Sequence, residues 1–253
     1  MNAVVVAGGF ASPELAEVAG ERRKGLIRLG GRETVSYVLE ALQGTEEVTN
    51  VALVGPPEMK PLANGVIFVH EGGTVSQNLL LGIGALGLAG AADPVLVLPS
   101  DLPLLRSEDI RGFLGRLPRG IGAAASFVRR DLVERDQPGA PYTYIKMREG
   151  QFATGGITVV TPPVAARLAE LIQQLHDSRK SQVRVALMLG LGLLIRFRLG
   201  RLRIDEGVHA VRRLVGENVW ADLEASPSTS LDLDGPEDYL YLRDNWERLR
   251  SSQ

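Results

Sequence analysis

The sequence predicts an α/β protein, a three-layer α/β/α sandwich around a mainly parallel central sheet. Short valine-rich apolar runs recur along the chain, and segments with helical periodicity separate them. Continuous apolar runs are typical of parallel strands that are covered on both faces. Strands that alternate with helices are typical of α/β domains. Because the 253 residues contain no long linker or internal repeat, we expect one domain over residues 1–253.

The first half of the chain is expected to alternate regularly between strands and helices. It opens with a strand at 2–7, which Gly8 and Gly9 end. Ser12 is a suitable N-cap and Pro13 suits the first helical position, so a short helix should follow and stop near Gly20. Further strands are expected at 26–29, 51–54, 66–69 and 94–98, and further helices at 34–42, at 75–88 and from a cap at Ser107 onward.

The second half is expected to complete the sheet and to add a hairpin. The segment 142–147 and the stretch from Phe152, joined around Glu149-Gly150, predict a hairpin inserted at about 129–155. A turn is expected at Thr154-Gly155-Gly156. Further strands are expected at 123–128, at 156–160 and near Val219 and Leu231, and helices at 162–175, 182–189, 205–215 and from Pro236 onward.

The composition excludes several classes of function. The chain has 28 basic and 30 acidic residues, a formal charge of -2, which does not match a nucleic-acid-binding surface. It has no cysteine, which excludes disulfides and thiolate chemistry and suits a reducing cytoplasm. The longest apolar stretch, 185–195, is shorter than the roughly 20 residues that span a bilayer. We therefore expect a cytoplasmic protein without membrane or nucleic-acid partners.

Residues directly after predicted strands are the candidates for a site, because ligands bind beyond the carboxyl ends of parallel strands. Ala7-Gly8-Gly9 follows the first strand, and Lys24 lies downstream. Glycine backbone can approach a phosphate closely, and a lysine supplies a compact positive charge. Glycines after a strand more often form a plain turn, which is the alternative explanation.

Three aspartates are candidate ligands for magnesium. Asp101 follows the apolar strand at 94–98, and Asp232 and Asp234 alternate on a predicted extended segment, so that both side chains point to one side. Carboxylate oxygens are the ligands that Mg²⁺ prefers. As alternatives, Asp101 could occupy a turn, and Asp234 or Gly235 could be the N-cap of the helix that starts at Pro236.

A second glycine turn lies between a predicted strand and a helix. It contains Gly72 and Gly73, and Asn78 follows. Backbone amides and the Asn78 side chain are candidates for reading the edge of a nucleotide base. An ordinary strand-to-helix turn is an equally good explanation.

Taken together and in this order, these segments resemble the MobA-like NTP transferases of the GT-A superfamily, over nearly the whole chain. The resemblance rests on Ala7-Gly8-Gly9, Lys24-Gly25-Leu26, Gly30-Gly31-Arg32, Asp101-Leu102-Pro103 and the run Asp232 to Asp238. The chain departs from the family where it inserts residues 10–21 and carries Arg22-Arg23 in place of an Arg-Met-Gly or Arg-Leu-Gly element before the lysine.

The resemblance implies a nucleotidyltransferase of nucleotide-diphospho-sugar transferase-like fold. It implies that Lys24 and Asp101 act in catalysis and that Asp101, Asp232 and Asp234 hold Mg²⁺. The nucleoside triphosphate would contact Ala7, Gly8, Gly9, Gly72, Gly73 and Asn78, and Arg179-Lys180 could add charge near an acceptor that is a phosphorylated or acidic small molecule. Two alternatives stay open: a GT-A glycosyltransferase that consumes a nucleotide sugar, and a non-catalytic nucleotide-binding protein.

Overall fold

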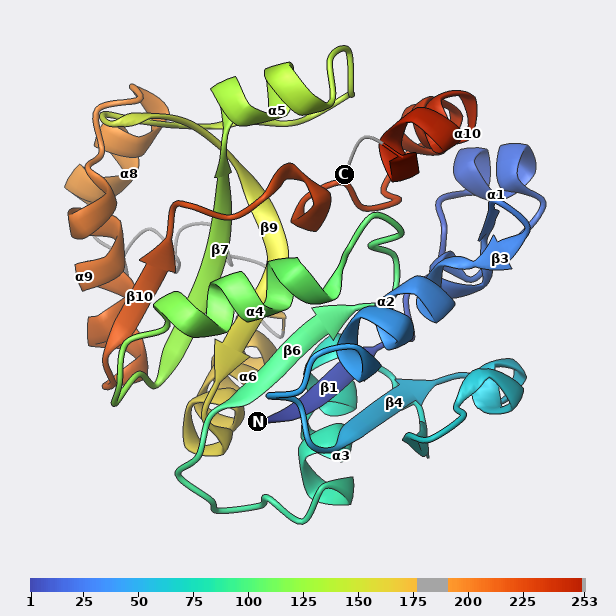
Figure 1. Ribbon diagram of the computed structural model, residues 1–253. Helices are drawn as coiled ribbons and strands as arrows, with labels where there is room; N and C mark the ends of the chain where they lie inside the picture. Colours follow the sequence, from blue (N-terminus) through green and yellow to red (C-terminus); the bar gives the residue numbers. More distant parts are fainter. Residues whose placement is uncertain (177–190, 252–253) are drawn as a thin grey trace.

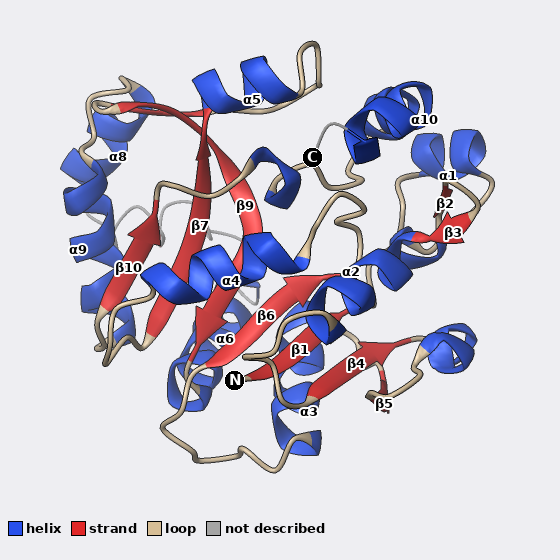
Figure 2. Ribbon diagram, in the orientation of Figure 1, coloured by secondary structure: helices blue, strands red, loops and turns tan. Residues whose placement is uncertain are grey.

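The central sheet is mainly parallel and carries helices on both faces (Figures 1 and 2). The computed structural model describes residues 1–176 and 191–251. The strand order is β10-β7-β9-β6-β1-β4-β5, with β8 paired to β9 beside this path. Neighbours in this order are parallel except where β9 pairs with β6 and β7. The strands of this sheet are β1 (Asn2–Val6), β4 (Val51–Gly55), β5 (Ile67–His70), β6 (Val95–Pro99), β7 (Ala123–Arg129), β8 (Ile145–Met147), β9 (Gly150–Val160) and β10 (Val219–Asp222).

The helices form layers on the two faces of the sheet. The α-helices of the described residues are α1 (Pro13–Ala19), α2 (Thr34–Gln43), α3 (Val75–Ala85), α4 (Ser107–Arg116), α5 (Arg130–Asp136), α6 (Pro162–His176), α8 (Leu191–Arg198), α9 (Ile204–Val215) and α10 (Pro236–Ser251). Helices α2 and α4 cover one face, and α3, α6 and α9 cover the other (Figure 1). Within residues 1–176 and 191–251, we find no helix that is both long and apolar enough to cross a membrane.

Alternation along the buried strands explains the two-sided core. In β1, Ala3 and Val5 contribute to the core under α2 and α4, whereas Val4 contributes to the core under α3 and α6. Successive side chains of a strand point to opposite faces, so a strand between two helical layers carries apolar residues at consecutive positions. β1 and β6 are adjacent and parallel at the centre of the sheet.

Helices from near both ends of the chain pack against each other. Helices α1 and α10 pack together through a cluster that includes Leu15, Leu242 and Leu249 (Figure 1, blue and red). The predicted capping of α1 is confirmed: Ser12 Oγ accepts a hydrogen bond from Leu15 N at 3.1 Å, and Gly20 ends the helix at φ 71°. Helix α10 therefore packs against the segment after β1 that contains α1.

Two predicted local structures are wrong. Near Leu231 there is no strand; Pro227–Thr229 forms a 3-10 turn, η3, because Pro227 has no N–H for a strand ladder and Thr229 Oγ1 donates to Ser226 O. Thr154-Gly155-Gly156 lies inside β9 and does not form a turn. A Cβ at Gly155 would lie 2.2 Å from Ser126 Oγ, so this glycine serves close packing in the strand.

Other predicted boundaries shift. Residues 26–29 form the end of a 3-10 turn, η1 (Lys24–Leu26), and a two-residue strand, β2 (Arg28–Leu29), which pairs with β3 (Arg32–Glu33) outside the main sheet. The cap of α4 is Arg106, whose N–H donates to Asp109 Oδ2 at 3.0 Å, and Ser107 is the first helical residue.

The predicted hairpin is present as β8 and β9, and the preceding segment also contains α5. The predicted helix at 182–189 and the pair Arg179-Lys180 lie outside the described residues. That 1–253 forms one domain stays a prediction.

Gly30→Ala is expected to lower the free energy of unfolding by about 2–4 kcal/mol. Gly30 has φ 56°, and a Cβ there would lie 2.1 Å from Trp246 Nε1 of α10. Gly31→Ala is the matched control, because Gly31 has φ 81° but nothing lies within 4 Å of its Cβ position. Urea denaturation measures both variants. An equal loss in the two would mean that the contact with Trp246 contributes nothing.

Candidate active site

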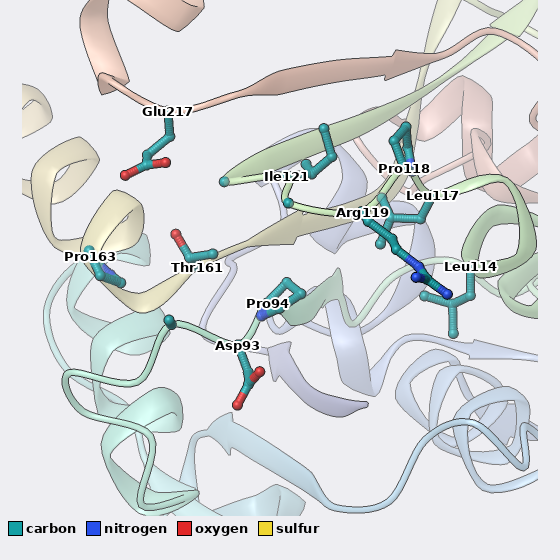
Figure 3. A pocket seen from close by; sticks show the side chains of 13 residues that line it. Asp93, Pro94, Leu114, Leu117, Pro118, Arg119, Ile121, Thr161, Pro163 and Glu217 are labelled. Carbon is teal, nitrogen blue, oxygen red and sulfur yellow. The ribbon is translucent and has the colours of Figure 1, made fainter.

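A cavity lies at the amino ends of the parallel strands, and a cluster of acidic side chains lies at the opposite edge of the sheet, beyond their carboxyl ends. The cavity, of about 520 Å³, lies at the edge where β6 and β7 begin and is lined in part by Asp93, Pro94, Arg119, Thr161 and Glu217 (Figure 3). Ligands of parallel α/β sheets bind at the other edge, beyond the carboxyl ends of the strands. We therefore place the candidate active site at that other edge.

The two central strands bring their following loops together. Val6 pairs with Pro99, so Gly8 and Asp101 each follow a paired strand end by two residues. Asp101 is only 5% exposed. Such burial of a carboxylate is unfavourable unless the charge is compensated, which makes this aspartate the first candidate for a functional group.

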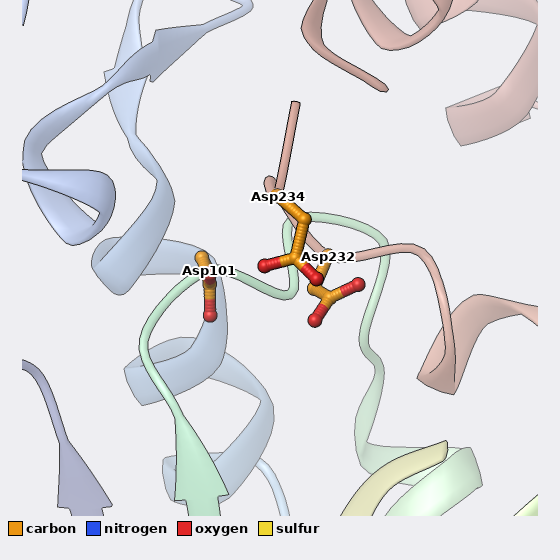
Figure 4. Close-up of side chains that lie close together, drawn as sticks. All are labelled: Asp101, Asp232 and Asp234. Atoms are coloured by element: carbon orange, nitrogen blue, oxygen red, sulfur yellow. The ribbon is translucent and has the colours of Figure 1, made fainter. Parts of the chain in front are cut away.

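Asp101, Asp232 and Asp234 form what we call the acidic cluster. One carboxylate oxygen from each lies within 4.8 Å of the others (Figure 4). Asp232 and Asp234 come from the segment before α10, in which Leu231 and Leu233 alternate with them and are buried. The predicted alternation therefore directs two carboxylates towards the loop after β6, across a long separation in sequence.

Asp238 stabilises the start of α10. Its Oδ2 accepts hydrogen bonds from Asp234 N at 3.1 Å and Gly235 N at 2.7 Å. A carboxylate in the first turn satisfies amides that have no partner within the helix. The helix start thus does not require the Asp232 and Asp234 carboxylates.

Lys24 reaches the acidic cluster although the inserted residues 10–21 lengthen the loop before it. Lys24 N donates to Gly9 O at 3.1 Å and Ala11 N donates to Arg22 O at 2.9 Å, so the excursion that carries α1 is closed by backbone hydrogen bonds. Lys24 Nζ lies 3.4 Å from Asp101 Oδ2 and also forms an ion pair with Asp234. Lys24 and Asp234 are 210 positions apart in sequence.

The pKa values in the site reflect uncompensated negative charge. Burial and repulsion from Asp101 and Asp234 raise the pKa of Asp232 to about 7. Burial also raises the pKa of Asp101, although Lys24 opposes that shift. Burial lowers the pKa of Lys24, but attraction to Asp101 and the hydrogen bond with Asp234 outweigh it, so the net shift is upward. The site therefore favours additional positive charge.

Asp232→Asn is expected to stabilise the metal-free protein, and only at higher pH. The pKa of Asp232 is about 7 when folded and near 4 when unfolded, so wild-type stability should fall as pH rises between these values. The asparagine variant lacks this fall and should exceed wild type by roughly 2–4 kcal/mol above pH 7, with little difference at pH 4. Urea unfolding in EDTA from pH 4 to 8 measures this. A difference independent of pH would contradict it.

The two glycine segments lie against each other. A Cβ at Gly8 would lie 2.5 Å from Asn78 Nδ2 and 2.6 Å from Glu71 Oε2, so a larger residue there would force these side chains to move. A Cβ at Gly9 would lie 3.7 Å from Lys24 Cδ. Ala7 is buried, and its N–H donates to Val54 O, so it continues the sheet.

Asn78 and Gln77 hold the second glycine segment. Asn78 is 3% exposed, and its Oδ1 accepts a hydrogen bond from Gly72 N at 2.6 Å. Gly73 N donates to Gln77 Oε1 at 2.8 Å. In this structure Asn78 shapes the loop, and its contact with a base stays a prediction.

Arg23 and Glu71 pair beside the glycine segments, and this pairing was not predicted from the sequence. Arg23 donates to both oxygens of Glu71, at 2.6 and 3.2 Å, and to Gly8 O at 3.3 Å. Its guanidinium lies 3.8 Å from the centre of the Phe10 ring. The positions of the two residues in the sequence could have marked them as site candidates, because Glu71 directly follows β5 and Arg23 directly precedes Lys24. The pairing itself joins segments 48 positions apart.

Similarity to known proteins extends over most of the chain. The family model of the MobA-like NTP transferase domain matches residues 3–187. A solved structure of a hypothetical transferase from Thermus thermophilus has 28% sequence identity and a TM-score of 0.78, covering 94% of this chain and 98% of that one. No curated protein was found to match.

More distant solved structures share the fold. CMP:2-keto-3-deoxy-manno-octonic acid synthetase complexed with CTP has 14% identity and a TM-score of 0.63, covering 98% of both chains. A 4-diphosphocytidyl-2C-methyl-D-erythritol synthase from Anaerococcus prevotii has 13% identity and a TM-score of 0.60, covering 98% of this chain and 96% of that one. These likenesses confirm the predicted nucleotide-diphospho-sugar transferase-like fold.

Proposed function

Because the chain belongs to the MobA-like NTP transferase family, we propose that it transfers an NMP group from a nucleoside triphosphate to a phosphorylated or acidic small molecule. It is a nucleotidyltransferase by family. An acceptor oxygen attacks the α-phosphorus in line, and the bond to the bridging oxygen breaks with release of pyrophosphate. Such transfers depend mainly on positioning and on neutralising charge.

The observation that best supports this proposal is that Lys24 forms ion pairs with both Asp101 and Asp234. The three come from separate parts of the chain and form ion pairs beyond the ends of β1 and β6. A polyanionic substrate needs both a fixed cation and groups that can hold a divalent metal. This arrangement supplies both.

The acidic cluster fits magnesium. It offers three carboxylates with oxygens within 4.8 Å of one another, and burial and mutual repulsion raise the pKa of Asp232 to about 7. Oxygen ligands at about 2.1 Å are typical of Mg²⁺. Bound there, the metal would neutralise phosphate charge. Asp101, Asp232 and Asp234 are the residues that would hold it.

The glycine segments would hold the nucleotide. The backbone at Gly8 and Gly9 can approach the phosphates closely, and Lys24 extends beside it to neutralise their charge. The closeness of Gly8 to Asn78 and Glu71 supports a position for the base near Gly72 and Gly73. Glu71 and Arg23 add an acceptor and a donor at that position.

Pyrophosphate release is the direct test of the function. The protein with Mg²⁺ would be incubated with each of four nucleoside triphosphates and a panel of sugar phosphates and other acidic acceptors. We expect release that depends on both the nucleotide and one class of acceptor. Consumption of nucleotide sugars without pyrophosphate would instead indicate a glycosyltransferase.

Lys24→Ala is expected to depress kcat by at least roughly tenfold, about 1.4 kcal/mol, with the fold intact. Within residues 1–176 and 191–251 the Lys24 ammonium forms ion pairs with two carboxylates of the acidic cluster, and it should neutralise charge that grows on the leaving pyrophosphate. Steady-state kinetics at saturating nucleotide measures this, with Arg22→Ala as a control that removes an exposed charge nearby. Unchanged turnover in Lys24→Ala would move the catalytic assignment to Arg22 or Arg23.

A further inference from the structure

The ammonium of Lys24 lies where the acidic cluster would bind a metal. We propose that Lys24 is an exchangeable counter-cation: it neutralises the cluster in the ligand-free protein and leaves it for the triphosphate when a divalent cation binds. This inference rests on the proposed function, because it assigns a coupling between metal and nucleotide to the same site.

Charge balance supports a resident cation. Among the ion pairs of residues 1–176 and 191–251, Lys24 is the cation that pairs with the acidic cluster. Its side chain is mostly buried, and it lies between carboxylates from two distant segments. Without it, Asp101 would be a nearly buried negative charge beside two others. The lysine therefore offsets the repulsion among the three carboxylates in the ligand-free protein.

Lys24 and a metal would compete for the same oxygens. The ammonium is 3.4 Å from Asp101 Oδ2 and bonds directly to Asp234 Oδ1. A small divalent cation needs carboxylate oxygens at about 2.1 Å, and like charges that share those oxygens repel each other. The cluster therefore favours one of the two cations at a time.

Hydrogen bonds hold the backbone of Lys24 in place, whereas the end of its side chain can rotate to a second position. Lys24 N donates to Gly9 O, and Lys24 O accepts from Thr34 Oγ1 at 2.8 Å. The next residue, Gly25, packs so closely that a Cβ would lie 2.7 Å from Ser100 Oγ. The side-chain stem passes beside Gly9, so rotation of its terminal bonds carries the ammonium from the cluster toward phosphates held at Gly8 and Gly9.

The exchange makes metal and nucleotide binding cooperative. Metal alone must displace the ammonium, which then has no new partner, so metal should bind weakly. When a triphosphate is present, the displaced ammonium pairs with phosphate, and each ligand should strengthen the binding of the other.

Lysine labelling tests the exchange in the unaltered protein. Trace acetylation with acetic anhydride, followed by mass spectrometry, reports the reactivity of each amine, with Lys60 and Lys146 as internal controls. Addition of Mg²⁺ alone should raise Lys24 labelling at least threefold relative to these controls, and a subsequent non-hydrolysable nucleotide should lower it. Unchanged Lys24 labelling at saturating Mg²⁺ would overturn the exchange.

A neutral variant tests the competition directly. Lys24→Met keeps the stem and removes the charge, and Lys146→Met removes an equal charge from an exposed position of β8. Mn²⁺ titration followed by electron paramagnetic resonance, without nucleotide, should show at least fivefold tighter binding in Lys24→Met than in wild type or Lys146→Met. With a non-hydrolysable nucleotide, wild type should gain Mn²⁺ affinity and Lys24→Met should gain much less.

The outcomes separate this inference from the function on which it rests. Equal Mn²⁺ affinity in wild type and Lys24→Met, with loss in Asp101→Asn, would leave the metal site in place and refute only the exchange. No Mn²⁺ binding in wild type and Lys24→Met, with or without nucleotide, would refute the proposed metal site and the exchange together. Circular dichroism of each variant confirms folding, and the labelling result stands without any substitution.

Discussion

Asp101→Asn is expected to lower turnover by at least roughly 1,000-fold, or about 4 kcal/mol in activation free energy. The carboxylate follows β6, the strand beside β1 at the centre of the sheet, and lies within the acidic cluster. An amide of the same shape keeps the packing but removes the negative charge that a divalent cation and Lys24 both need. Pyrophosphate release at saturating nucleotide, acceptor and Mg²⁺ measures the loss.

The same substitution should not destabilise the metal-free protein. Burial raises the pKa of Asp101, so its ionised form is unfavourable in the folded state without metal. Thermal unfolding in EDTA should therefore give Asp101→Asn a Tm at or above that of wild type. Asp205→Asn, at an exposed carboxylate of α9, is the control and should leave turnover unchanged. Substantial turnover in Asp101→Asn would remove Asp101 from the mechanism.

Asp222→Ala is expected to lower the free energy of unfolding by about 3–5 kcal/mol. Asp222, at the end of β10, is 1% exposed and accepts two hydrogen bonds from Arg116 of α4, at 3.0 and 2.6 Å. Loss of the carboxylate leaves a partly buried guanidinium without this partner and Glu224 N without an acceptor. Urea denaturation at neutral pH measures the change.

An exposed ion pair provides the contrast. Glu134→Ala removes the partner of Arg130 in α5, where both side chains are largely exposed, and should cost less than about 0.5 kcal/mol. The site lies at a different part of the sheet, so Asp222→Ala should retain turnover at temperatures where it is folded. Similar losses of stability in the two variants would show that burial does not increase the contribution of the Asp222–Arg116 ion pair to the free energy of unfolding.

The sheet was predictable where burial leaves a strong signal. The runs at 2–7, 51–54 and 94–98 are apolar at consecutive positions because helices cover both faces, and all three are strands of the central sheet. The run near Leu231 misleads for a related reason: Leu231 and Leu233 are buried, but the segment does not form a strand. Glycines in β9 mislead because they accommodate packing from Ser126 and Leu102, which sequence spacing does not reveal.

Parts of the site were predictable and parts depend on tertiary structure. The position of Asp101 after β6 and the alternation of Asp232 and Asp234 are visible in the sequence, and the structure brings these residues together. The pairing of Arg23 with Glu71 depends on how the loop after β1 meets the end of β5. The burial of Asn78 depends on Gly8, which has no side chain to keep the two segments apart.

Backbone hydrogen bonds join the loop after β1 to the segment that ends at Lys24. The geometry of the active site therefore does not depend on the number of residues between them. Gly9 and Lys24 meet across one hydrogen bond, whatever lies between them. The intervening residues build α1, which packs on α10 and contributes no residue to the acidic cluster. Residues can therefore be added or removed between Ala11 and Arg22 without lengthening the path from phosphate to ammonium. This part of the chain is open to evolutionary insertion beside a site that tolerates little displacement.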